Sequence, residues 1–347
     1  ENDVIFIVAG TNKTKINPNV RRIGAPADSI NSIVVNAVDE NGKPTNYSRE
    51  GIVLSFFNKP DIGYYGGTST HPLMAHDAYG LSYAVGTSYA APWITRKMAF
   101  LIYKMGLSRE IAKALLIDSA VKWRGNEDPS KLIGFGVVPI KIDDIIKSPD
   151  DEIKFVMQGT SELYDTYTYK IPVPIYKEKQ PYIAKATLCY FPKCNRNQGV
   201  DYTNTEMDLH FGRIKPNGKG IATINDNKQN NDDEICYLRE GSARRHFRKW
   251  DNVKHICEFF KPRGSAKTVY GSGLWGLSIK NVDRLGGNDG KGVRFGLVIT
   301  LKEIRGVNRY QEFIQQCSLK AWLVNEIDVE NRIDLYNKAE QEITFED

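Results

Sequence analysis

Cysteine is scarce in this chain, with five residues among 347. An odd number of cysteines at irregular spacings does not suit the paired framework that stabilises small secreted domains. The scarcity favours a reducing compartment, and we expect a cytoplasmic protein. The spacing of Cys189 and Cys194, with His210 downstream, is poor for zinc. No metal and no cofactor is therefore expected.

Long hydrophobic runs and charge of one sign are also lacking. No stretch of eighteen apolar residues occurs, which argues against a membrane-spanning helix. The 47 basic and 42 acidic residues leave a net charge of only +5, which gives little reason to expect nucleic acid. A basic cluster with aromatic residues at 244–250 is better explained as the charged face of a short helix. Neither a membrane nor nucleic acid is expected as a partner.

The beginning of the chain has the pattern of a parallel sheet. Residues 4–8 form an apolar run that predicts a fully buried parallel strand, and Ala9-Gly10-Thr11-Asn12 follows at its carboxyl end. A second buried strand is predicted over residues 30–38. Since α/β folds bind ligands at the carboxyl ends of their strands, the residues after the first strand are candidates for a site.

The run Gly86-Thr87-Ser88-Tyr89-Ala90-Ala91-Pro92 is the most informative stretch of the chain. Gly86 lacks a Cβ, so the chain can turn sharply and a substrate backbone can approach closely. Apolar residues at spacings of three and four follow, from Ile94 to Met105, and predict a helix that begins at Ser88. The free N–H groups of a helix start favour an anion beside the hydroxyl. We therefore predict a nucleophile at Ser88, with Pro92 in the first helical turn, where its missing N–H is tolerated.

A simpler interpretation of this run is an ordinary N-cap before a buried helix, which describes most helices that begin at serine. Six specified positions would match by chance in about one chain in 10⁴, so we favour the nucleophile.

The stretch around Ser88 resembles the serine motif of the subtilisin-like proteases, peptidase family S8. Four upstream segments occur in the order of that family: Gly24-Ala25-Pro26-Ala27, the valine-rich strand ending at Val38, Tyr47-Ser48-Arg49-Glu50-Gly51 and Lys59-Pro60-Asp61-Ile62. The resemblance covers residues 1–140. It implies a bacterial-type serine endopeptidase that hydrolyses peptide bonds through an acyl-enzyme on Ser88.

The resemblance also implies an oxyanion site. In the family, a strand that ends in Ala-Gly-Asn supplies a side-chain amide to the oxyanion hole, whereas here Thr11 stands in that place and Asn12 comes one residue later. We assign the donor to Asn12, because an amide N–H₂ reaches further and donates better than a threonine hydroxyl. An ordinary Gly-Thr-Asn turn is the alternative. For substrate binding, the candidates in the predicted loop over 63–84 and at the nucleophile are Gly66, Gly67, Gly86 and Thr87.

Residues 1–85 contain neither of the segments, Asp-Ser/Thr-Gly and His-Gly-x-x-His, that carry the catalytic Asp and His of the family. His71 and His76 precede Ser88, but their spacing gives no reach to it, and we expect surface histidines. The resemblance thus implies that this chain is the C-terminal portion of a longer protease and is inactive alone. Its partner would be the preceding segment, which carries the catalytic Asp and His. The alternative is a non-catalytic peptide-binding or regulatory module with a degenerate protease fold. A truncated sheet would also leave an open edge, from which we expect a homodimer.

After Ser148-Pro149-Asp150-Asp151 the pattern changes, and short runs separated by turns predict strands. These runs are residues 152–157, 166–173, 184–191, 207–214, 274–279, 293–301, 321–324 and 327–335. We therefore expect a partial subtilisin-like α/β domain over 1–147 and a mostly antiparallel β-sandwich, with a jelly roll as one form, over 148–347. The second part resembles the tails of large intracellular bacterial subtilases, some encoded beside an ATPase, so an ATPase is one implied partner.

Overall fold

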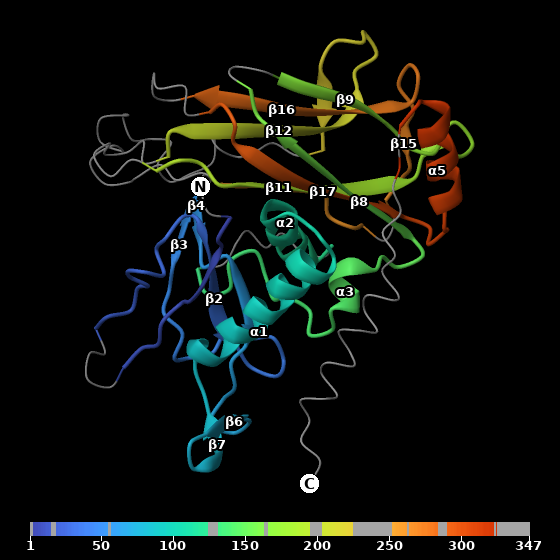
Figure 1. The fold of residues 1–347 in the computed structure, drawn as a ribbon. Coiled ribbons are helices and arrows are strands. Elements are labelled where there is room, and N and C mark those ends of the chain that lie inside the picture. Colours follow the sequence, from blue (N-terminus) through green and yellow to red (C-terminus); the bar gives the residue numbers. More distant parts are fainter. Residues whose placement is uncertain are drawn as a thin grey trace.

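The computed structural model describes residues 3–14, 19–54, 57–123, 131–162, 166–194, 203–224, 252–261, 264–283, 290–322 and 324. A small parallel sheet with helices beside it lies at one end of the molecule, and two larger antiparallel sheets lie at the other (Figure 1). The predictions for 244–250 and 327–335 concern residues outside the described ranges.

The parallel sheet has the order β1-β2-β5, formed by β1 (Phe6–Ala9), β2 (Ser32–Val38) and β5 (Ile62–Tyr65). β2 is buried along its whole length, as expected for a central strand covered on both faces. The prediction of full burial for the first strand is wrong, because β1 is an edge strand here and its Phe6 is 66% exposed. Two short hairpins accompany the sheet: β3 (Ile52–Leu54) with β4 (Phe57–Lys59), and β6 (Leu73–Asp77) with β7 (Gly80–Ala84).

The helices follow the sheet in the sequence. α1 (Thr87–Ala99) continues into the π-helical turn η1 (Phe100–Lys104), and α2 (Arg109–Ala120) is capped by Ser108. The placement of Pro92 in the first helical turn is wrong, because it lies further inside α1. The short α3 (Asp143–Ile146) ends this part, and no helix among the described residues is long and apolar enough to cross a membrane.

Two four-stranded antiparallel sheets make up the second half, with the orders β14-β11-β17-β8 and β13-β12-β16-β9. Their strands are β8 (Glu152–Thr160), β9 (Thr166–Pro172), β11 (Tyr182–Tyr190), β12 (Thr205–Ile214), β13 (Ile221–Thr223), β14 (Val253–Cys257), β16 (Leu274–Asp283) and β17 (Arg294–Glu303). Both sheets contribute to one buried cluster, which includes Leu188, Leu297, Phe211 and Trp275. A small pair, β10 (Lys179–Gln180) and β15 (Lys267–Thr268), and the helix α5 (Tyr310–Leu319) complete this half.

Six of the predicted strands in this half are confirmed. The strand predicted over 321–324 is wrong, because Ala321 lies in a turn directly after α5, with a φ of 59°. The loop predicted over 63–84 is wrong where the hairpin β6–β7 forms.

α2 packs on the sheet that contains β11 and β17 (Figure 1). The hydrophobic cluster of the first half includes Cys189 of β11 and Val298 of β17. A Cβ at Gly296 would lie 2.4 Å from the backbone nitrogen of Ile111, so the glycine lets helix and strand approach closely. The buried Asp118 carboxylate reaches the second half, with Lys185 Nζ at 3.3 Å and Thr300 Oγ1 at 3.0 Å. Since this core is shared, the domain boundary at residue 148 stays a prediction.

Candidate active site

Ser88 lies in the first turn of α1 and its side chain is exposed. Among the residues that the structure describes, none forms a hydrogen bond with its hydroxyl. The N-cap residue Gly86 has a φ of 154°, a conformation that favours glycine, and a Cβ there would lie 2.9 Å from Nδ2 of Asn12. The N–H of Thr87 donates to Asn12 and that of Tyr89 to the Gly86 carbonyl. The Ser88 N–H between them is left as the donor for a ligand at this helix start.

Asn12 reaches the start of α1 from the end of β1. Its Oδ1 accepts from the N–H of Thr87 at 3.1 Å and from the Thr87 hydroxyl at 3.0 Å. Because both partners donate, this side of the amide must be the oxygen, and the N–H₂ group lies on the side of Gly86. The structure therefore brings together Asn12, Gly86, Thr87 and Ser88.

Thr11 precedes Asn12 in a left-handed backbone conformation, with a φ of 69°. This conformation is unfavourable for a β-branched residue and costs about 1–3 kcal/mol. The Thr11 hydroxyl is buried and has no hydrogen-bond partner among the described residues. Asn12, and not Thr11, is thus the residue in hydrogen-bond contact with the nucleophile-bearing helix, while its role as oxyanion donor stays a prediction.

Gly66 and Gly67, after β5, are buried and used for close packing. A Cβ at Gly66 would lie 2.5 Å from that of Ala37, and Gly67 has a φ of 76°. The Tyr47 hydroxyl is shared between the carbonyls of Gly66 (3.0 Å) and Gly67 (2.7 Å), and the Gly66 carbonyl also accepts from the Gly86 N–H at 2.9 Å. Tyr47 and the two glycines therefore hold the N-cap of α1 in place. A role of these glycines in substrate binding stays a prediction.

A Tyr47→Phe variant should lower the free energy of unfolding by about 1–2 kcal/mol, because two carbonyls lose their shared donor in a partly buried place. Burial raises the pKa of Tyr47, so its hydroxyl remains a donor over the whole range in which the protein would be assayed. Urea denaturation measures the loss. Tyr65→Phe is the matched control, since the Tyr65 hydroxyl donates to the His71 carbonyl at 2.7 Å on the exposed surface, and a change of under about 0.5 kcal/mol is expected there. Equal losses in both variants would contradict a special role of Tyr47.

None of the described histidines contacts Ser88 through a hydrogen bond. His71 is exposed and its Nδ1 lies 3.2 Å from Oε1 of Glu40, while His76 is exposed on β6, so the surface position expected for both is confirmed. His210 lies on β12, and His255 on β14 has its Nδ1 2.8 Å from the Thr187 hydroxyl. No described histidine forms a hydrogen bond with Ser88, so the structure shows no base for it.

The hairpin β6–β7, which leads into Ser88, was missed by the sequence reasoning. It projects away from the rest of the molecule (Figure 1). One of its faces is exposed and carries the apolar residues Met74, Leu81 and Tyr83 beside His76, with Met74 opposite Tyr83 and Leu81 opposite His76. The alternation of larger and smaller residues in these two segments was the signal that could have predicted it.

The comparisons with known proteins give a partial match. No curated protein sequence matches this chain. Similar solved structures include the prenylagaramide maturation protease PagA, with 24% sequence identity over 42% of this chain and 50% of that chain and a TM-score of 0.33. A lanthipeptide protease has 17% identity over 41% of this chain and 50% of that chain, with a TM-score of 0.32. The epidermin leader peptide processing serine protease EpiP from Staphylococcus aureus has 19% identity over 41% of this chain and 38% of that chain, with a TM-score of 0.31. The chain thus spans about half or less of the length of these proteins. The model of the Subtilase family, Peptidase_S8, matches residues 1–136, the part of the chain that carries Asn12 and Ser88.

Proposed function

We propose that Ser88 is the nucleophile of a serine endopeptidase. The observation that carries this proposal is the exposed, unpaired Ser88 hydroxyl at the start of α1, with the Asn12 amide fixed beside it by Thr87. The family match over residues 1–136 supports the same chemistry. In a non-catalytic helix start, no such arrangement of hydroxyl and free donors would be required.

The reaction begins when Ser88 Oγ attacks the carbonyl carbon of a peptide bond. The negative charge that develops on the carbonyl oxygen is stabilised by the Ser88 N–H and the Asn12 N–H₂, assisted by the positive end of the α1 dipole. Collapse of the tetrahedral intermediate expels the amine and leaves an acyl-enzyme, which water then hydrolyses. Gly66, Gly67 and Gly86 would let the substrate backbone approach.

The attack also needs a base for the Ser88 proton and a carboxylate to orient that base. We propose that both are in a preceding segment that packs against β1, and that this chain alone has little activity. The position of β1 at the edge of its sheet supports the proposal, because its outer side can pair with a further parallel strand. In the isolated chain the same edge would pair with a second copy and form a homodimer.

The second half would be a β-sandwich appended to the protease part, since its two antiparallel sheets share a buried cluster. An ATPase partner and a cytoplasmic location are further proposals, supported by the sequence resemblance and the scarcity of cysteine.

A fluorophosphonate probe, which labels activated serines, tests the proposed function. We expect slow or no labelling of this chain alone, and labelling at Ser88 when the segment with the catalytic Asp and His precedes it. Mass spectrometry of the labelled peptide gives the site.

Two variants serve as controls for the labelling. Ser88→Ala should abolish it, whereas Ser82→Ala, which removes a nearby hydroxyl on β7, should leave it unchanged. Rapid stoichiometric labelling of the chain alone would show that the base is not missing. If the longer preparation is not labelled, the protein is a non-catalytic peptide-binding or regulatory module instead.

A further inference from the structure

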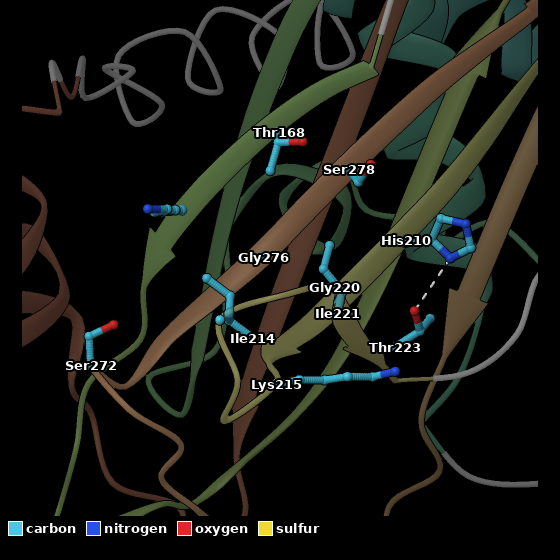
Figure 2. Close-up of a pocket in the computed structure, with 12 residues that line it drawn as sticks. Thr168, His210, Ile214, Lys215, Gly220, Ile221, Thr223, Ser272, Gly276 and Ser278 are labelled. Carbon is cyan, nitrogen blue, oxygen red and sulfur yellow. Dashed lines mark hydrogen bonds between the residues drawn. The ribbon is translucent and has the colours of Figure 1, made fainter.

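A cavity of about 570 Å³ lies on the outer face of the sheet β13-β12-β16-β9 (Figure 2). Alternate residues of these strands, such as Phe211 and Leu277, point into the buried cluster, so their neighbours His210 and Ser278 face outward into the cavity. In Figure 1 this sheet is at the end of the molecule opposite α1, the helix whose first turn holds Ser88. The cavity is therefore separate from the candidate active site.

Small polar residues form the floor of the cavity. Ser278 pairs with Thr168 on one side and with His210 on the other, which places three polar side chains in one row across the sheet. Thr223 lies at the edge, with its hydroxyl 3.4 Å from Nδ1 of His210 (Figure 2). In the next row Gly276 adds no side chain. The floor thus offers hydroxyl and imidazole groups, and the Ile221 side chain covers the row of Gly276.

Glycines allow β13 to form a wall of the cavity. A Cβ at Gly276 would lie 2.7 Å from Cγ1 of Ile221, and a Cβ at Gly212 would lie 2.1 Å from the Ala222 carbonyl oxygen. Any side chain at these two positions would push β13 away from the sheet. The strand and the turn before it, Lys215 to Gly220, therefore depend on glycine to enclose the cavity.

The charge of the cavity is positive. Lys170 on β9 and Lys215 after β12 line it, and none of the described residues that line it is an aspartate or glutamate. In the row beyond Ser278, Lys280 stands opposite Asp208, so that pair adds no net charge. Two ammonium groups and several neutral donors around one cavity are the groups that bind phosphate oxygens.

We propose that this cavity binds a phosphate-bearing small molecule of about nucleotide size. Its volume lies within the range of roughly 300–1,000 Å³ that is typical of small-molecule sites. Lys170 and Lys215 contact the phosphate groups, and Thr168, Ser278 and Thr223 donate hydroxyl hydrogen bonds. This binding does not depend on Ser88 and is independent of the proposed protease activity.

Isothermal titration of the full chain with pyrophosphate, and separately with ATP, tests the proposal at low and at physiological salt. A double variant, Lys170→Gln with Lys215→Gln, should weaken binding by about tenfold or more, because two charge-assisted contacts are lost. Lys219→Gln is the matched control, since Lys219 is exposed in the same turn but does not line the cavity, and its affinity should not change. Thermal melting of each variant verifies that it is folded.

Tighter binding of ATP than of pyrophosphate would support the proposal and show that the sugar or base also contacts the cavity. Equal affinities would support it with the phosphates as the recognised part. If neither pyrophosphate nor ATP binds at about 1 mM, the proposal is overturned, because the cavity then has no useful affinity for phosphate. An equal loss of affinity in the Lys219→Gln control would also overturn it, because the binding would then reflect only general charge attraction.

Discussion

An Asp61→Asn variant is expected to lose about 3–5 kcal/mol of unfolding free energy at pH 7, because it leaves two buried lysines without their counter-charge. Asp61 precedes β5, and its carboxylate forms ion pairs with Lys59 and with Lys113 of α2, the latter at 3.1 Å. It also accepts from the N–H of Val34 at 2.8 Å. The side chains of Asp61 and both lysines are 1% exposed or less. Asparagine can keep hydrogen bonds here but not the charge.

The pH dependence of this loss follows from the pKa values of the group. Burial alone would raise the pKa of Asp61, but Lys113 and Lys59 outweigh it and hold the pKa below 3.8. The contribution of Asp61 is therefore present above pH 3.8 and lost as the pH falls through its lower folded value. Burial lowers the pKa of Lys59 from 10.5 to about 8. Between about pH 8 and pH 10.5, Lys59 is protonated in the unfolded chain but not in the folded one, so its contribution to stability rises with pH.

Without the Asp61 charge, the buried Lys59 releases its proton more readily, and the deficit of Asp61→Asn should be smaller at pH 10 than at pH 7. Urea denaturation of both proteins at the two pH values measures this. Glu162→Gln breaks an exposed ion pair with Lys291 and should change stability by less than about 0.5 kcal/mol at either pH. A deficit of Asp61→Asn that is as small as in this control would show that the buried charges are not coupled.

An Asn12→Asp variant should retain nearly all of its stability and lose about 10²–10³-fold in kcat, measured in the preparation that labels at Ser88. The carboxylate can still accept from the N–H and hydroxyl of Thr87, and a negative charge near a helix start is favourable. However, aspartate offers no N–H to the oxyanion and repels it. The variant thus separates the two functions of the Asn12 amide, holding the helix start and stabilising the oxyanion.

Two further variants complete this experiment. Asn12→Ala should lose the same activity and also about 1 kcal/mol of stability, because the first N–H of α1 loses its acceptor. Thr11→Val should leave kcat nearly unchanged, since the Thr11 hydroxyl makes no hydrogen bond with a described residue. If Thr11→Val were as slow as Asn12→Asp, the oxyanion donor would be Thr11.

The elements that sequence patterns predicted well are those fixed by short-range spacing. The helix that carries Ser88 and the buried strand β2 follow from apolar periodicity, and Ser108 caps α2 as its residue type suggests. The start of this helix was predicted to within one residue, but Pro92 is the sixth residue of α1 and so lies beyond the first turn. The helix α5 was missed, since its only buried residues are Phe313 and Cys317 and its apolar signal is weak.

The candidate site was predictable in part. The hydroxyl at Ser88 and the amide at Asn12 come from segments 76 residues apart. Only the resemblance to the family predicted that they belong to one site. The hydrogen bonds of the Tyr47 hydroxyl and the buried ion pairs of Asp61 could not be predicted, although the Tyr-Ser-x-x-Gly and Lys-Pro-Asp segments were noticed. Their partners, Gly67 and Lys113, are distant in sequence, and no periodicity reports which side chains meet across a core.

The contact of α2 with β11 and β17 limits how freely the two halves of this protein could be exchanged for others. A different tail would have to offer a glycine beneath Ile111, where Gly296 lies, and a lysine and a hydroxyl for Asp118, where Lys185 and Thr300 lie. Without them, the helix would meet a side chain or leave a buried carboxylate uncompensated. The second half is thus part of the core of the region that matches the Subtilase model, and the two halves are not interchangeable modules.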